Sequence, residues 1–225
     1  MRGIPDASEV VMVGRDILLA ELTGARLHIA HVSTKDAVRL IKDAKKRGIK
    51  ITAETCPHYF TLSDDEVKSF NTSFRVNPPL RSKDDIKAIK DGLKDGSIDV
   101  IATDHAPHAD AEKDVEFDKA PCGMIGLETA LPLAIEGLIE QKIIDWKALI
   151  SQMSGAPAGI LGLKDKGSLA EGADADVAII DPEAEWVYEK AGILSKSKNS
   201  PFIGKTLKGK VLYTICGGKV VYTDA

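Results

Sequence analysis

The sequence predicts an α/β fold built on a parallel sheet, followed by a small β-rich region. Helical and strand patterns alternate along the first hundred residues, which is typical of βα units. The clearest strand pattern begins at Ile98 and turns polar at Thr103-Asp104-His105, where a nearby proline stops a central strand from continuing. After Gly162 the pattern changes to short strands and glycine-rich turns. We therefore divide the chain into residues 1–162 and 163–225.

The helices are predicted from capping residues and apolar spacing. Asp6-Ala-Ser-Glu9 has the form of a capping box ahead of a helix, and Ser63-Asp-Asp-Glu66 has the same form ahead of a shorter one. Ser33-Thr34 and Ser82 are expected to cap two amphipathic helices. In addition to the short helix after Ser63–Glu66, the sequence predicts helices at residues 10–22, 35–47, 83–94, 127–140, 145–152 and 156–161.

The strands are predicted from short apolar runs between turn residues. Gly217-Gly218 suits a tight turn between two strands of a hairpin. Asn77–Arg81 is expected to be a rigid extended loop, because its two prolines fix φ and remove hydrogen-bond donors. The irregular, charged stretch 109–123 is a candidate active-site loop. The predicted strands are 27–32, 49–53, 98–103, 176–180, 211–215 and 219–222.

Composition bounds the function classes. The chain has 225 residues, a net charge of −4 and 44% hydrophobic residues, the profile of a soluble globular protein. It has no basic footprint for nucleic acid or an anionic membrane, no apolar run long enough to span a bilayer and no signal-peptide core. Its three cysteines are widely spaced, which argues against a disulfide framework and favours a reducing compartment. We therefore expect a cytoplasmic protein.

The histidines point to a site. All five lie at or just beyond the predicted carboxyl ends of strands, which meet at one edge of a parallel sheet. We choose His31 over His28 as a metal ligand because it is nearer the end of its strand. Asp104 is the second ligand, because the small residues on its face leave room for an ion. His108 could reach a substrate anion. The other three have plainer roles: His28 is expected to pack against a helix, His58 to be structural, and His105 to support its neighbours or face solvent.

A carboxylate and an imidazole together suit Zn²⁺, which lowers the pKa of bound water to near 7. A nearby aspartate can take the proton from that water and pass it to a leaving nitrogen. Zinc needs at least three protein ligands, whereas this interpretation finds two, His31 and Asp104. The plainer alternative is a loop with two exposed histidines and an N-capping aspartate.

Four motifs resemble, in order and spacing, the type I dihydroorotases of the amidohydrolase superfamily: His31-Val-Ser-Thr34, Glu54-Thr-Cys-Pro-His58, Asn77-Pro-Pro-Leu-Arg81 and Thr103-Asp-His-Ala-Pro-His108. The stretch from Gly167 to Asp181 resembles the C-terminal strand return of that superfamily. The resemblance implies a (β/α)₈ TIM-type barrel, of which this chain holds strands six to eight, with a small C-terminal β-rich appendage. It also implies a centre of one or two Zn²⁺ ions that reversibly opens dihydroorotate to N-carbamoyl-aspartate in pyrimidine biosynthesis.

The resemblance also implies roles for single residues. His31 would bind metal, and Asp104 would bind metal and serve as general base and acid. Asn77 and His108 would contact the substrate, with the backbone around Cys122-Gly123 completing the pocket. The two prolines beside Asn77 would hold its amide in place. We expect a small-molecule substrate and a homo-oligomer, and an assembly with aspartate transcarbamoylase stays open.

The chain departs from the family in what it lacks. The His-x-His pair of the first strand, the acidic residue or modified lysine of the fourth and the histidine of the fifth are not in it. We therefore expect the C-terminal portion of such an enzyme, inactive without the other half. Three alternatives remain: an allantoinase or hydantoinase, a non-catalytic homologue that scaffolds aspartate transcarbamoylase, and an unrelated α/β domain.

Overall fold

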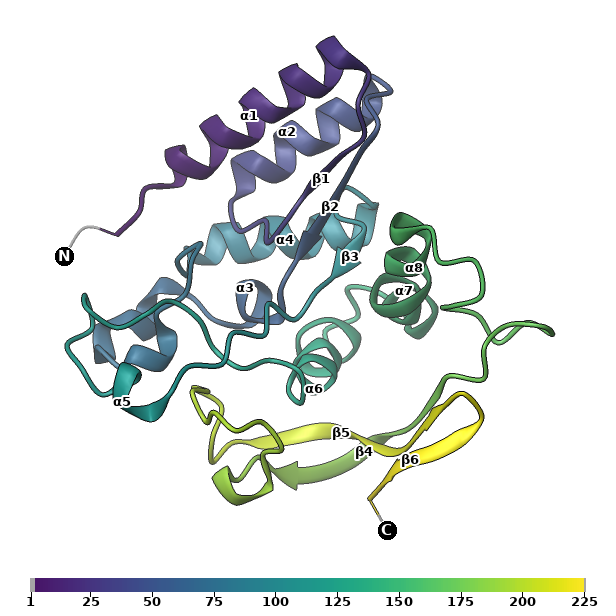
Figure 1. The fold of residues 1–225 in the computed structure, drawn as a ribbon. Helices are drawn as coiled ribbons and strands as arrows, with labels where there is room; N and C mark the ends of the chain where they lie inside the picture. The colour runs from purple at the N-terminus through teal and green to yellow at the C-terminus, as the bar shows by residue number, and fades with distance from the viewer. Residues whose placement is uncertain (1–2, 225) are drawn as a thin grey trace.

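The computed structural model describes residues 3–224, which form two three-stranded sheets with helices around the first (Figure 1). The first sheet is parallel, with the strand order β1-β2-β3. In its register Leu27 lies opposite Ile51, and Glu54 lies opposite Val100. The predicted parallel sheet is therefore confirmed. Its strands are β1 (Leu27–Ile29), β2 (Ile51–Thr55) and β3 (Val100–Ile101).

Three long helices pack on one another and on one face of this sheet: α1 (Asp6–Thr23), α2 (Lys35–Lys46) and α4 (Lys83–Asp95) (Figure 1). Apolar side chains from all three, such as Ile17, Ile41 and Ile89, join those of Ile29 and Ile51 in one buried cluster. Burial of this apolar surface is the main force that holds the layers together.

Capping explains where these helices begin. The side chain of Thr34 accepts a hydrogen bond from Ala37 N, and Ser82 forms a reciprocal capping box with Asp85, as predicted for both helices. The capping box predicted at residues 6–9 is wrong. Pro5 occupies the cap position of α1, and the carboxylate of Glu9 instead binds residues 33 and 34. A tertiary contact has replaced a local one.

The remaining helical elements are short. Ser63 makes no capping bond, so the second predicted capping box is also wrong, and a 3₁₀ turn follows it. The two helices predicted at 145–152 and 156–161 form one continuous run through a π-helical turn that ends before Pro157. A wider turn accommodates a proline ring that would otherwise clash with the preceding turn. These elements are α3 (Pro57–Thr61), η1 (Asp64–Ser69), η2 (Thr72–Phe74), α5 (Asp110–Lys113), α6 (Ala130–Ala134), η3 (Ile135–Ile139), α7 (Trp146–Ile150), η4 (Ser151–Gly155), α8 (Ala156–Leu161) and η5 (Lys190–Gly192).

The second sheet is antiparallel, with the order β4-β5-β6. The predicted hairpin is present, and Gly217 and Gly218 both have positive φ, as a type I′ turn requires. β4 runs past the predicted end at residue 180, and its register shifts around Pro182, which has no N–H to donate. Its strands are β4 (Val177–Val187), β5 (Thr206–Cys216) and β6 (Lys219–Thr223).

Two features of the first region are left without a partner within residues 3–224. β1 and β3 are the edge strands of the parallel sheet, so one side of each backbone has no neighbouring strand. One face of α1 exposes apolar side chains at helical spacing, including Val11, Leu18 and Leu22. Over the same residues, no helix is both long and apolar enough to cross a membrane.

Candidate active site

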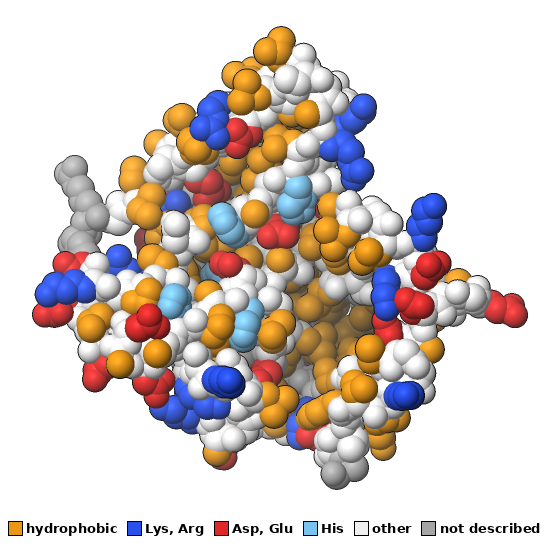
Figure 2. Space-filling model, viewed as in Figure 1, with side chains coloured by type: hydrophobic (Ala, Val, Ile, Leu, Met, Phe, Trp, Pro, Cys, Tyr) orange, Lys and Arg blue, Asp and Glu red, His pale blue; other side chains and the backbone are white. Residues whose placement is uncertain are grey.

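Three segments that leave the parallel sheet at the same edge carry the predicted site. His31 follows β1, Cys56 and His58 follow β2, and Asp104 follows β3. Because β2 is the middle strand, the Cys56–His58 segment lies between the other two. Backbone hydrogen bonds extend past the strands, from Val32 N to Glu54 O and from Ala102 N to Thr55 O, both 2.9 Å. Figure 2 shows histidine side chains gathered on this side of the molecule, beside acidic ones.

The backbone is unusual at two of these positions. His31 and Asp104 have φ values of 41° and 48°, in the left-handed region that residues other than glycine rarely adopt. Such conformations cost free energy and persist only where the surroundings hold them, which is often at functional sites. β1 ends at Ile29 and β3 at Ile101. The alternation of strand side chains therefore does not extend to His31 or Asp104, and it cannot assign their faces.

A group of possible metal donors forms around Asp104. The ligand atoms of Cys56, His58 and Asp104 lie within 4.8 Å of one another. Cys56 and His58 are buried, and the Nε2 atom of His58 has no hydrogen-bond partner among residues 3–224. Burial, and to a smaller extent the nearby charge of His31, lowers the pKa of His58 to about 3. Burial also raises the pKa of the Cys56 thiol, with a smaller effect from the charge of Asp104. His31 and Asp104 therefore both lie within electrostatic reach of His58.

This donor set fits a zinc ion in chemistry and number. Thiolate, imidazole and carboxylate are the ligands that zinc takes in proteins, and three protein donors are the usual minimum. A neutral histidine with an unpartnered buried nitrogen is suited to binding a cation. Cys56 and His58 were not predicted as donors, although their place just after β2 was a usable signal. His31 is not one of the three grouped atoms.

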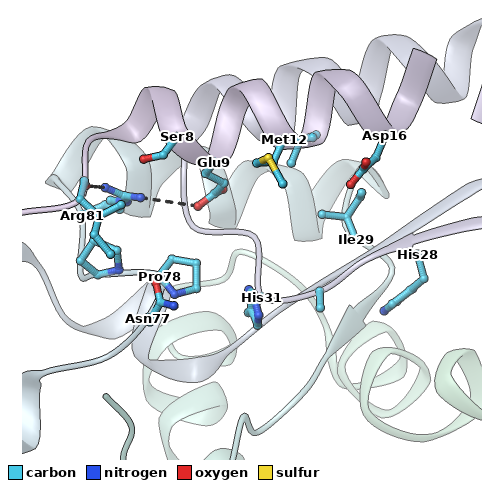
Figure 3. A pocket seen from close by; sticks show the side chains of 14 residues that line it. Ser8, Glu9, Met12, Asp16, His28, Ile29, His31, Asn77, Pro78 and Arg81 are labelled. Atoms are coloured by element: carbon cyan, nitrogen blue, oxygen red, sulfur yellow. Dashed lines mark hydrogen bonds and ion pairs between the residues drawn. The ribbon is translucent and has the colours of Figure 1, made fainter. Parts of the chain in front are cut away.

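A cavity of about 330 Å³ lies beside His31 (Figure 3). α1 forms one wall, and the end of β1 and the loop from Asn77 to Arg81 form the others. His31 and Asn77 both line it, so the structure brings a predicted ligand and a predicted substrate contact to one space. Asp104 is not among its lining residues.

His28 also lines this cavity, and its environment differs from the prediction. It is exposed and does not pack against a helix. Its ring nitrogens lie 2.8 Å from Thr52 Oγ1 and 3.2 Å from Glu54 Oε2 on the next strand. The register pairs His28 with Thr52, which places both side chains on the face opposite the helices.

The other predicted substrate contacts form a second group. His108 Nε2 lies 3.0 Å from the carbonyl oxygen of Cys122. Gly123 has a φ of 137°, and a Cβ atom there would lie 2.5 Å from the Cβ of Ala106. Only glycine allows this close approach.

Asn199, which was not predicted as a site residue, holds this second group in place. Its amide nitrogen donates to Ala106 O at 2.9 Å and to Gly123 O at 3.2 Å, and its Oδ1 accepts from His108 N at 3.1 Å. Asn199 is buried and comes from the C-terminal region, in no motif that would have pointed to it. His105, by contrast, supports its neighbours: its Nδ1 accepts from Gly126 N at 3.1 Å.

A parallel sheet with polar residues gathered at the carboxyl ends of its strands is typical of an α/β enzyme, and the comparison with known families agrees. The chain belongs to the amidohydrolase family, which it matches over residues 9–221. It is 57% identical over 222 residues to the dihydroorotase of Geotalea daltonii and 54% identical to that of Endomicrobium trichonymphae. These matches cover 99% of this chain and 52% and 53% of the relatives, so the chain spans about half the length of the curated relatives it matches.

Solved structures give the same picture of the fold. The L-hydantoinase (dihydropyrimidinase) from Arthrobacter aurescens matches with a TM-score of 0.93 at 30% identity, over 98% of this chain and 50% of that one. The dihydropyrimidinase from Brevibacillus agri matches with a TM-score of 0.89 at 28% identity, with the same coverage. These matches confirm the predicted fold class, a part of an amidohydrolase barrel with a β-rich appendage.

Proposed function

We propose that this chain forms part of a dihydroorotase, a zinc-dependent enzyme that reversibly hydrolyses the cyclic amide of dihydroorotate to N-carbamoyl-aspartate. The observation that carries the proposal is the meeting of Asp104 with two further donors, at the edge where His31 also lies. The relatives named dihydroorotase support this substrate over the hydantoinase alternative, because they are 54–57% identical and the hydantoinase structure above is 30% identical.

The proposed roles follow from the positions of the residues. His31 and Asp104 hold the zinc, and Cys56 and His58 are close enough to contribute to its site. Zinc supplies a positive charge that polarises a carbonyl group and acidifies water. The carboxylate of Asp104 takes a proton from the attacking water and returns it to the leaving nitrogen.

The remaining site residues bind and orient the substrate. Asn77 offers an amide beside the cavity wall, on a segment stiffened by two prolines. His108, held by the carbonyl of Cys122 and by Asn199, binds a substrate carboxylate, and Gly123 keeps the nearby backbone close.

We propose further that the chain is inactive alone and needs the other half of the barrel, supplied covalently or as a separate chain. The free edge of β1 and the apolar outer face of α1 suit a neighbouring βα unit. A pyrimidine-pathway role, a cytoplasmic location and a homo-oligomer belong to the same proposal. An assembly with aspartate transcarbamoylase is the remaining open part of it.

The test is complementation. The chain is purified alone and also co-expressed with the N-terminal half of the Geotalea daltonii relative, and both samples are assayed on dihydroorotate, hydantoin and allantoin. We expect no turnover by the chain alone and turnover of dihydroorotate by the pair. Turnover by the chain alone, with its mass confirmed, would contradict the need for a partner. Preference for hydantoin or allantoin would contradict the proposed substrate, and a pair without zinc or activity would favour the scaffold.

A further inference from the structure

One partly buried carboxylate joins the two walls of the cavity beside His31. Glu9, in the first turns of α1, has only 11% of its side chain exposed. Its Oε1 accepts hydrogen bonds from Ser33 N at 2.9 Å, Thr34 N at 3.0 Å and Thr34 Oγ1 at 3.0 Å. Its Oε2 accepts a further bond from the hydroxyl of Ser33. Four donors from two consecutive residues therefore converge on one side chain.

Arg81 connects the same carboxylate to the opposite wall. Its guanidinium is 6% exposed, and its Nη2 lies 3.7 Å from Glu9 Oε2. Its Nε donates to Ser33 Oγ at 3.2 Å, and its Nη1 donates to Ile4 O at 2.7 Å and pairs with Asp6 at 2.8 Å. A buried cation needs such partners, because an unpaired charge there would be costly.

These contacts fix the two segments that carry predicted site residues. Ser33 and Thr34 follow His31 closely along the chain, and Arg81 ends the loop that begins at Asn77. Figure 3 shows Glu9 reaching down from α1 toward Arg81, with His31 and Asn77 below the helix. The left-handed backbone of His31 requires support from its surroundings, and the bonds to Glu9 begin two residues later.

We infer that Glu9 is a positioning residue that sets the orientation of His31 and the place of the Asn77–Arg81 loop. It acts through Ser33, Thr34 and Arg81 and touches neither substrate nor metal. This inference rests on the proposed function, since positioning matters only if His31 and Asn77 serve the site. A role limited to docking α1 on the sheet is the competing explanation.

The variants are Glu9→Gln, which keeps one acceptor oxygen, and Glu9→Ala, which keeps none. Glu21→Gln is the matched control, because Glu21 lies on the same helix outside the cavity and its carboxylate binds Arg47 and not the segment that follows His31. Each variant is made in the chain co-expressed with the N-terminal half described above. The readouts are amide hydrogen exchange residue by residue, zinc affinity, and kcat and KM for dihydroorotate.

We expect Glu9→Ala to speed exchange at Ser33 and Thr34 by about tenfold or more, because two amide bonds to a charged acceptor are lost. Zinc affinity should fall by about tenfold, as it does when supporting partners of a metal ligand are removed. Glu9→Gln should recover part of both losses, and Glu21→Gln should match the parent protein. If Glu9→Ala does not fold, Glu9→Gln provides the test, because it should give smaller changes in the same direction in amide exchange at Ser33 and Thr34 and in zinc affinity.

Unchanged zinc affinity in a folded Glu9 variant would overturn the inference, and so would exchange that rises uniformly along the chain. Failure of the proposed function looks different. In that case the parent protein has no turnover of dihydroorotate, whereas local exchange at Ser33 and Thr34 and the affinity for zinc alone still report on Glu9.

Discussion

The two sheet regions of this chain are stabilised in different ways. The parallel sheet and its helices share a buried cluster that runs from Val13 to Leu149 and needs nothing from the C-terminal region. The antiparallel sheet has little core of its own: every residue of β6 is exposed, and Leu207 is one of few buried apolar side chains on β5. It packs through a second cluster, in which Leu207 and Phe202 meet Leu133 from α6. The parallel-sheet region therefore has its own core and carries most of the candidate site. The antiparallel sheet depends for its stability on packing against that region.

The difference in stability between the two regions should be largest for substitutions of large apolar side chains. Phe60 is 1% exposed within the first cluster, so Phe60→Ala should lower the free energy of unfolding by about 3–5 kcal/mol. Val220 on β6 is 60% exposed, and Val220→Ala should change the free energy of unfolding by less than about 0.5 kcal/mol. Urea unfolding of the two variants measures both values, and similar losses would contradict the difference between the regions.

The part of the pH dependence of stability that comes from histidines should also arise in the first region, because residues 163–225 contain no histidine. His58 has a folded pKa of about 3, below its ordinary value of 6.5, so between these values the unfolded chain binds a proton that the folded chain excludes. Stability therefore falls as the pH drops from 6.5 toward 3, by up to about 1.4 kcal/mol per pH unit.

Urea unfolding of the metal-free chain at pH 7, 6 and 5 tests this slope, and His58→Asn should remove most of it. The other four histidines and the carboxylates are the same in both proteins, so the difference isolates His58. Equal slopes for the two proteins would show that His58 does not titrate as its burial implies.

A substitution where the antiparallel sheet packs against η3 should have a smaller effect on stability. Gly209 on β5 has a φ of 93°, and a Cβ atom there would collide with the Cδ1 of Ile135 in η3. Gly204 has a similar φ of 84°, but a Cβ there would meet nothing within 4 Å. Both alanine variants carry the backbone strain, so Gly209→Ala should cost about 1–2 kcal/mol more than Gly204→Ala, from overpacking. Equal losses of stability for the two variants in thermal unfolding would mean that β5 is not closely packed against η3 at Gly209.

The sequence predicted the elements whose signals are local. α2 and α4 begin where Thr34 and Ser82 cap them, because a cap bond joins residues three apart. The start of α1 was mispredicted because Glu9 bonds across the fold to Ser33. Two strands of the parallel sheet, β1 and β3, are shorter than predicted. Val32 is buried beyond the end of β1, and an apolar pattern does not separate packing from pairing.

The candidate site also contains residues that local motifs predicted and residues that only the fold brings in. The motifs predicted which strand ends would carry His31 and Asp104, and the structure places both near His58. Asn199 was beyond prediction, because it reaches His108 across 91 residues of sequence and lies in no motif. Glu9 was assigned to a cap from its spacing, and its contacts with the His31 segment depend on how α1 docks. Roles in catalysis stay predictions for all of these residues.

The account depends most on Asp104 as the group that binds metal and moves the proton. The direct test is the turnover of dihydroorotate and the zinc content of Asp104→Asn in the co-expressed pair, with Asp91→Asn, an exposed position on α4, as the matched control. We predict that Asp104→Asn lowers kcat by about 10²–10⁴-fold and lowers bound zinc, while the control keeps both. An Asp104→Asn protein with normal turnover and normal zinc would contradict the account.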